Sequence, residues 1–203
     1  MSDTTTQLLT TVTADDDQHL AALHEALLER ATTESSVDAS YRVVDSPVGA
    51  LLLAATEAGV VRVAFAVEDH DRVLESLGAT VGSRILRGGN RLDPLARELD
   101  DYFAGGRRAF DVPVDLRLAR GFRLSVLQHL KEIPYGSTES YGQVAVASGS
   151  PRAVRAVGSA CATNPLPIVV PCHRVVRSDG SLGGYLGGLP AKERLLDLER
   201  GRH

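Results

Sequence analysis

The chain has 203 residues, of which 43% are hydrophobic and 24% charged, the balance of a globular protein with one large or two small domains. No apolar run approaches the length of a membrane span, and the polar N-terminus lacks the basic and apolar regions of a signal peptide, so we expect a cytoplasmic protein with no membrane partner. Two cysteines are too few for a disulfide framework or a four-cysteine zinc site, and reduced thiols fit the cytosol.

The formal net charge of -4 is unevenly distributed along the chain. The stretch from Arg117 to Leu186 holds eight of the 22 basic and three of the 26 acidic residues, a balance of +5. The remainder therefore carries 14 basic and 23 acidic residues, a balance of -9. This asymmetry favours a C-terminal domain that binds a polyanion, and solvated surface charge is an equally good explanation.

Residues 1–38 form a polar N-terminal extension. Within it, Leu20, Leu23, Leu27 and Ala31 follow three aspartates at helical spacing, which predicts one amphipathic helix. No residue of this extension indicates chemistry.

The sequence pattern of residues 39–115 predicts a small α/β domain with strands and helices. Apolar, β-branched segments at Tyr41–Val44, Leu51–Ala55 and Val60–Phe65 are joined by short turns that contain glycine. This pattern is typical of an antiparallel meander of three strands.

The same domain should contain two helices and a further strand. One helix is expected near Asp71–Leu77, and another begins with Asp93 as N-cap and Pro94 at its first position. The alternation of apolar and polar residues over Phe110–Leu116 predicts an edge strand.

Residues 116–203 read as a helical domain. A first helix should run from Phe122 to Pro134, and Ser140 with Gln143 forms a capping box for a second helix that ends near Ala147. Ser150 and Pro151 should start a third helix, which ends near Cys161. Two short helices joined by a turn that contains glycine are a helix-turn-helix signature.

The third helix carries the candidates for DNA contact. Val154 and Val157 should face inward, whereas Arg152 and Arg155, also three residues apart, should share the outer face. Helix-turn-helix proteins place this helix in a groove of DNA. The alternative is a pair of helices that merely pack, with solvated arginines.

The sharpest chemical signal is Cys172. The apolar run Ile168–Val170 between two prolines predicts a short buried strand that leads into Cys172, His173 and Arg174. A thiolate is a good nucleophile once a base removes its proton. Because neighbouring side chains of a strand point apart, His173 would need a water to reach the thiol and a carboxylate to orient its ring. The alternative is a cysteine that only fills the core.

Other polar residues have a structural and a chemical interpretation. Tyr141 is either a proton donor or a packing residue, and Asn164 is by default a turn residue. The glycine-rich loop 183–188 either approaches a planar ligand or is only a loop. Cys161 is expected in the core, and Glu193, on a terminal helix, is by default exposed.

Together these motifs resemble the O6-alkylguanine-DNA alkyltransferases, also called methylated-DNA–protein-cysteine methyltransferases. The resemblance covers about Phe122–Leu198 and, more weakly, Tyr41–Phe65. The motifs that carry it are Pro171-Cys172-His173-Arg174-Val175, Ser140-Tyr141, Arg155-Ala156-Val157-Gly158, Asn164-Pro165, Tyr185 before a glycine pair, Lys192-Glu193 and Ser46-Pro47-Val48-Gly49.

The resemblance implies a fold and a reaction. The fold is an N-terminal ribonuclease H-like α/β domain followed by a helical, winged-helix-like domain with a helix-turn-helix. The reaction is the stoichiometric transfer of an alkyl group from O6-alkylguanine in double-stranded DNA to a cysteine, after the nucleotide is flipped out. We expect a monomer that needs no cofactor and no metal, and both activity on O4-alkylthymine and cooperative binding along DNA stay open.

The resemblance also assigns roles near the thiol. Cys172 would accept the alkyl group, and His173 would take its proton through a water while Glu193 orients the ring. Tyr141 would hold the flipped guanine and protonate it, and Asn164 would hold the turn before the active-site segment.

Further roles concern DNA and the base. Arg155 would fill the gap left by the flipped nucleotide, and Arg152 and Ser150 would contact DNA. The base pocket would be lined by Pro167, Val175, Tyr185 and Leu186, of which Leu186 replaces the small residue common in the family and should reshape the pocket.

Two other functions remain open from the sequence. The chain would be a non-catalytic module that recognises alkylated DNA, or a helix-turn-helix regulator with a redox-sensing cysteine. Replacement of Cys172 by alanine would separate these functions from repair.

Overall fold

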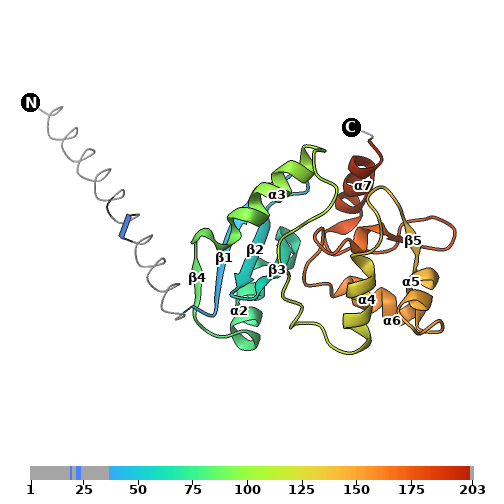
Figure 1. Cartoon of the computed structure of the whole chain (residues 1–203), viewed down its shortest axis with the longest axis horizontal. Helices are drawn as coiled ribbons and strands as arrows, with labels where there is room; N and C mark the ends of the chain where they lie inside the picture. The colour runs from blue at the N-terminus through green and yellow to red at the C-terminus, as the bar shows by residue number, and fades with distance from the viewer. Residues whose placement is uncertain (1–18, 20–21, 24–36, 202–203) are drawn as a thin grey trace, which may run out of the picture.

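The computed structural model describes residues 19, 22, 23 and 37–201. The helix predicted over Leu20–Ala31 lies almost entirely outside these ranges. Within the described part of the chain, no helix is both long and apolar enough to cross a bilayer. The described chain forms a sheet half and a helical half, which lie side by side (Figure 1).

The sheet half is built on four strands, β1 (Ala39–Val44), β2 (Leu51–Thr56), β3 (Gly59–Phe65) and β4 (Ile85–Arg87). Their order is β3-β2-β1-β4, with β4 parallel to β1 and the other pairs antiparallel. The predicted meander is confirmed. The fourth strand was not predicted, because three residues are too short to show an alternation.

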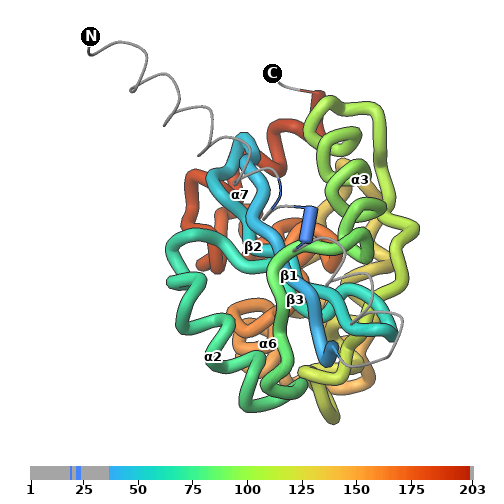
Figure 2. The backbone as a smooth tube through the Cα atoms, turned by 90° about the vertical axis from the view of Figure 1, so that its left-hand side faces the viewer, coloured from blue at the N-terminus to red at the C-terminus, as the bar shows by residue number. Residues whose placement is uncertain are grey.

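Both faces of the sheet are covered. Side chains of β2 alternate, so that Leu51 and Leu53 enter the main core while Leu52 and Ala54 enter a smaller core beneath α2 (His70–Thr80). Helix α3 (Asp93–Phe103) covers the main-core face. Figure 2 shows the two helices on either side of the strands.

Two local predictions in this half are wrong. Asp93 is the first residue of α3, and Leu92, at the end of the short 3-10 helix Asn90–Leu92, stands at the N-cap. Phe110–Leu116 is not a strand: a single parallel bridge joins Val60 to Val114. The Val60 amide donates to the Pro113 carbonyl at 2.8 Å, but Pro113 has no amide with which to continue a ladder.

The helical half contains five helical segments and two short strands after residue 120. The strands pair in parallel with each other. The elements are α4 (Phe122–Leu130), β5 (Glu139–Ser140), α5 (Tyr141–Ala147), α6 (Val154–Ala162), the 3-10 helix η3 (Cys172–Arg174), β6 (Val175–Val176) and α7 (Gly188–Glu199).

The helix-turn-helix consists of α5 and α6. The predicted capping box is confirmed: the Gln143 amide donates to Ser140 Oγ at 3.2 Å, and the Ser140 amide donates to Gln143 Oε1 at 2.7 Å. The third predicted helix starts later than expected. Residues 150–153 form a turn in which the Ala153 amide donates to the Ser150 carbonyl at 2.8 Å, so Arg152 precedes α6.

The inner face of α6 differs by one residue from the prediction. Val157 is fully buried as expected, but Val154 is 42% exposed. Val154 is the first residue of α6 and lies at its exposed end, so the prediction that it faces inward is wrong.

The two halves share one core. The main cluster joins β2, β3 and α3 to α4, α6, α7 and the segment around Cys172. The Val63 amide donates to the Pro165 carbonyl at 2.8 Å, and Arg62 Nη1 lies 3.3 Å from the carbonyl oxygens of Asn164 and Pro165. The sheet half therefore fixes the segment that leads to Cys172.

Candidate active site

The segment before Cys172 is a buried turn rather than the predicted strand. Ile168 has a φ of +75°, the Val170 amide donates to the Leu166 carbonyl at 2.7 Å, and the Cys172 amide donates to the Val170 carbonyl at 2.8 Å. The segment is buried, as predicted, but it has no neighbouring strand. It folds back on itself and starts η3 at Cys172.

The side chain of Asn164 supplies the hydrogen bonds that a neighbouring strand would otherwise provide. Its Nδ2 donates to the Val170 carbonyl at 2.8 Å, and its Oδ1 accepts from the Leu166 amide at 3.0 Å. The same Nδ2 lies 3.1 Å from Cys172 Sγ. A single fully buried amide therefore closes the turn and contacts the thiol.

Cys172 is 2% exposed, and burial raises the pKa of its thiol to about 11. The hydrogen bond from Asn164 and the positive charge of Lys192 oppose this rise. Lys192 is itself fully buried, donates from Nζ to the Val175 carbonyl at 2.6 Å, and has a pKa lowered by burial. The thiol is protonated at neutral pH, so a nucleophilic role requires a base.

His173 supplies a candidate base. Its Nε2 lies 2.8 Å from Glu199 Oε1, both side chains are fully buried, and burial lowers the pKa of His173. Because Glu199 is ionised, the shared proton belongs to Nε2, and Nδ1 of the neutral ring is an acceptor. No described residue forms a hydrogen bond to Nδ1.

The prediction that Glu193 orients His173 is wrong, because Glu199 holds this position. Glu193 is exposed on α7. One face of α7 is buried and follows the i, i+3, i+4, i+7 spacing of a helix. Its residues are Lys192, Leu195, Leu196 and Glu199. This periodicity was visible in the sequence and would have excluded Glu193.

Glu199 is the centre of a buried polar network. It accepts from Arg174 Nε at 3.0 Å and Nη2 at 2.8 Å, from the Tyr102 hydroxyl at 2.8 Å and from the Gly136 amide at 3.0 Å. Burial alone would raise the pKa of Glu199, but the hydrogen bonds from His173 and Arg174 outweigh it and hold the pKa at about 2. No sequence motif points to Tyr102, which lies on α3, 97 positions before Glu199.

Two tyrosines adjoin the thiol region. Tyr141 is half-buried, and a Cβ atom at Gly183 would lie 2.2 Å from its hydroxyl. The Tyr185 ring packs edge-on to Phe65 at 5.5 Å and to His173 at 6.4 Å between ring centres. The Tyr185 hydroxyl is buried without a hydrogen-bond partner among the described residues.

The remaining predicted residues occupy three places. Pro167 and Val175 are buried near Cys172, and Leu186 is half-buried and lines a groove that Asn164 also lines. Arg152 and Arg155 are exposed, and Ser150 is half-buried in the turn before α6. In the described chain, no group of three or more His, Cys, Asp or Glu side chains is arranged to hold a metal ion.

Comparisons with known proteins match both halves of the chain. Residues 39–116 match the family model of the 6-O-methylguanine DNA methyltransferase ribonuclease-like domain, and residues 121–201 match that of its DNA-binding domain. A methylated-DNA–protein-cysteine methyltransferase of Mycolicibacterium paratuberculosis is 42% identical over 163 residues, which cover 80% of this chain and 93% of that protein. One of Methanosarcina barkeri is 41% identical and covers 78% and 96%.

Solved structures agree with this assignment. Mycobacterium tuberculosis OGT in complex with DNA superposes with a TM-score of 0.70 and 39% identity, over 80% of this chain and 94% of that chain. The M. tuberculosis O6-methylguanine methyltransferase crystal structure gives a TM-score of 0.70 and 37% identity. Because the sheet half, the helix-turn-helix and the cysteine segment all lie within these matches, the chain belongs to the 6-O-methylguanine DNA methyltransferase family.

Proposed function

We propose that this chain repairs double-stranded DNA by transferring the alkyl group of O6-alkylguanine to Cys172. The observation that carries the proposal is the buried thiol beside a His173–Glu199 pair whose second ring nitrogen is an acceptor without a protein partner. Support also comes from relatives named methylated-DNA–protein-cysteine methyltransferase and from the DNA complex of the M. tuberculosis protein.

The proton of the thiol is the first obstacle. With a pKa of about 11, ionisation of Cys172 at pH 7 costs about 5 kcal/mol. His173 Nδ1 would take the proton through a bridging water, and the negative charge of Glu199 would stabilise the resulting imidazolium. Glu199 thus takes the role that the family resemblance implies for Glu193.

In the transfer step, Sγ attacks the alkyl carbon. The Sγ–C bond forms as the bond between that carbon and O6 of guanine breaks, and the leaving guanine gains a proton from the Tyr141 hydroxyl. The proton held by His173 balances the one that Tyr141 gives up. The product is a thioether, which no neighbouring group can hydrolyse, so each molecule reacts once and needs no cofactor.

The substrate must leave the base stack before the thiol can reach it, at a cost of a few kcal/mol. In this proposal, Arg155 enters the duplex and lowers that cost, while Arg152 and Ser150 contact the DNA backbone. The flipped base is received by backbone near Val175, and by the residues Pro167, Tyr185 and Leu186.

Two further proposals concern context. We propose a boundary between the two domains at residues 115–116, and the family matches over residues 39–116 and 121–201 support it. The protein is proposed to act in the cytoplasm, where Cys161 and Cys172, both free and buried, stay reduced.

The test is intact and peptide mass spectrometry after mixing the protein with excess duplex that carries one O6-methylguanine. The expected result is one added methyl per protein, located on Cys172 and never exceeded, and the same result for Cys161→Ala. A bound duplex without any mass change would contradict the proposal in favour of a non-catalytic binding module. DNA affinity that depends on oxidant, again without methyl transfer, would favour a redox-sensing regulator.

A further inference from the structure

A groove of about 660 Å³ lies between the sheet half and the helical half. Its lining includes four arginines, whereas Glu68 is its only carboxylate. The arginines are Arg62, Arg117, Arg120 and Arg123. Arg117 and Arg120 belong to the segment between α3 and α4, and Arg123 lies in the first turn of α4.

The charges in this groove are not balanced. Arg62 is paired with Glu68, and Arg117 Nε lies 2.6 Å from Asp115 Oδ2. Arg123 is half-buried and donates from Nη1 to Thr163 Oγ1 at 3.4 Å, and Arg120 is exposed. Neither Arg120 nor Arg123 forms an ion pair with any described residue, so two positive charges remain available to a ligand.

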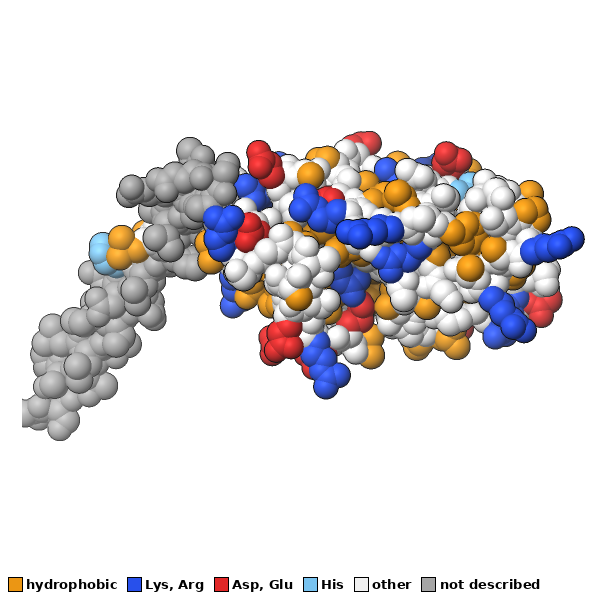
Figure 3. Space-filling model, turned by 90° about the horizontal axis from the view of Figure 1, so that it is seen from below, with side chains coloured by type: hydrophobic (Ala, Val, Ile, Leu, Met, Phe, Trp, Pro, Cys, Tyr) orange, Lys and Arg blue, Asp and Glu red, His pale blue; other side chains and the backbone are white. Residues whose placement is uncertain are grey.

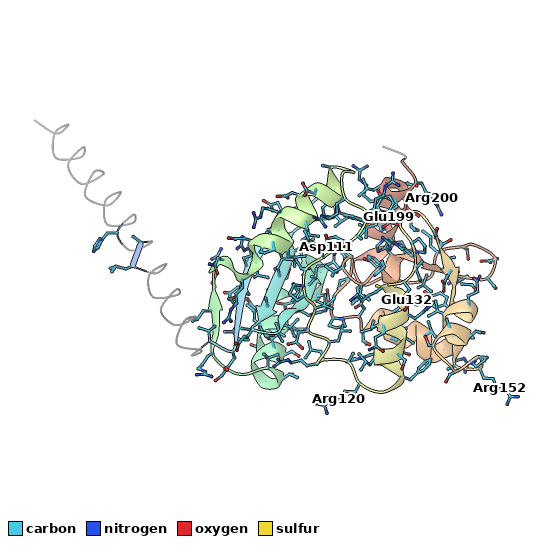
Figure 4. The ribbon with its side chains drawn as sticks, in the orientation of Figure 1. Asp111, Arg120, Glu132, Arg152, Glu199 and Arg200 are labelled. Carbon is cyan, nitrogen blue, oxygen red and sulfur yellow. The ribbon has the colours of Figure 1, made fainter. Side chains whose placement is uncertain are left out.

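The groove lies on the same face as the helix-turn-helix. Arg120 and Arg152 both project from the lower edge of the molecule, whereas Arg200 projects from the upper edge (Figure 4). Seen from below, Lys and Arg side chains run along this face across both halves (Figure 3). Asn164 lines the groove and contacts Cys172 Sγ, so the groove adjoins the active site.

We propose that Arg120 and Arg123 bind the phosphodiester backbone of duplex DNA outside the helix-turn-helix, so that the duplex footprint extends onto the domain junction. This inference rests on the proposed function. Thr163 follows α6, so Arg123 also connects this backbone site to the helix that carries Arg155. In this proposal, DNA contacts the protein both at Arg120 and Arg123 and at α6, and these contacts flank the flipped nucleotide.

Arginine contacts to phosphate have a measurable signature. Each neutralised phosphate releases counterions and adds about 0.9 to the slope of log affinity against log salt concentration. Loss of two contacts should therefore reduce the slope by about 1.8. Over a fourfold rise in salt, the parent protein then loses about 12-fold more affinity than the variant.

The experiment measures the binding of unmodified duplex to the full chain by fluorescence anisotropy over a salt series. Arg120→Gln with Arg123→Gln should give the shallower slope, and Arg120→Gln alone about half of the change. Arg120→Lys with Arg123→Lys should keep the parent slope, because the charge is kept. Arg200→Gln, on the opposite edge, is the matched control and should leave the slope unchanged.

A parent-like slope in both glutamine variants would overturn the inference, as would an equal change in Arg200→Gln. If Arg123→Gln does not fold, Arg120→Gln alone decides. Competition by inorganic phosphate at millimolar concentration in the parent but not in Arg120→Gln, with parent-like duplex binding in both, would mean a free-anion site and would also overturn it.

A second readout separates this inference from the proposed function. Alkyl transfer from the free base O6-benzylguanine, which has no phosphate, should proceed at the parent rate in the glutamine variants. If neither the parent nor any variant takes up a methyl group from the O6-methylguanine duplex, the proposed function fails, and the salt slopes still decide the DNA contact.

Discussion

At the scale of single residues, the carboxylate of Glu199 has more hydrogen-bond donors than any other group near the thiol. It is fully buried and faces the guanidinium of Arg174 as well as the imidazole of His173. A buried charge that loses its partner costs about 3–5 kcal/mol, because the remaining charge is left without compensation. Glu199 therefore contributes to stability and orients the proposed base.

Glu199→Gln should lower the free energy of unfolding by about 3–5 kcal/mol and reduce alkyl transfer at least tenfold, since Gln cannot stabilise an imidazolium. Urea unfolding and single-turnover rates measure the two effects. Glu193→Gln, an exposed change on the same helix, is the control and should alter neither. Equal losses in the two variants would contradict the role assigned to Glu199.

The same residue predicts a pH dependence. The pKa of Glu199 is lowered from 4.5 to about 2, so its stabilisation is fully present above pH 4.5 and is lost as the pH falls through 2. The loss amounts to about 3 kcal/mol. The difference in unfolding free energy between the parent and Glu199→Gln should therefore shrink between pH 5 and pH 2, and a constant difference would argue against an ionised Glu199.

At the scale of elements, the sequence predicts structures that depend on neighbouring residues. It does not predict the turn before Cys172, where a side chain takes the place of backbone hydrogen bonds from a neighbouring strand. The capping box at Ser140 and the meander of β1–β3 are encoded by neighbouring residues, so the sequence sufficed. The turn over 164–171 depends on the Asn164 amide, which acts as a neighbouring strand would, and no local periodicity reveals this.

In the candidate site, too, residues in local motifs were predicted and residues that depend on tertiary packing were not. The motif around Cys172 indicated the thiol and His173, whereas the role of Asn164 in the preceding turn was implied by the family resemblance. Glu199 was missed in favour of Glu193, although helical periodicity separates them, and Tyr102 was missed because its contact depends on the packing of distant elements.

The glycine-rich loop provides a test at this scale. A Cβ at Gly183 would meet the Tyr141 hydroxyl at 2.2 Å and its ring at 3.0 Å, whereas a Cβ at Gly184 would meet nothing within 4 Å. Gly183→Ala should therefore displace Tyr141 and slow alkyl transfer from DNA by tenfold or more while duplex affinity stays within twofold. Gly184→Ala should match the parent in both assays. Unchanged transfer by Gly183→Ala would show that the position of Tyr141 is unimportant.

At the scale of the whole molecule, the sheet half reaches the proposed catalytic network through Tyr102. Its hydroxyl, on α3, donates to the same Glu199 oxygen that His173 contacts. The bond is buried and charge-assisted, and bonds of this type contribute about 1.5–3 kcal/mol.

Tyr102→Phe keeps the ring and removes only this donor. The variant should lose about 1.5–3 kcal/mol of unfolding free energy and shift the pH profile of alkyl transfer, because one charge-stabilising bond to Glu199 is gone. Tyr135→Phe is the matched control: its hydroxyl makes a longer bond of 3.3 Å to the Leu198 carbonyl and is only half-buried. A pH profile shifted equally by both changes would assign Tyr102 a purely structural role.

The single core across the two halves has a consequence for how the protein loses structure. Residues of β2 and α3 belong to the same apolar cluster as Cys172 and Val175, so neither half can melt without exposing the other. The chain should behave as one cooperative unit despite its two family domains. A destabilising substitution in the core of the sheet half, far from the DNA, would then abolish the reactivity of Cys172 as fully as a substitution beside the thiol.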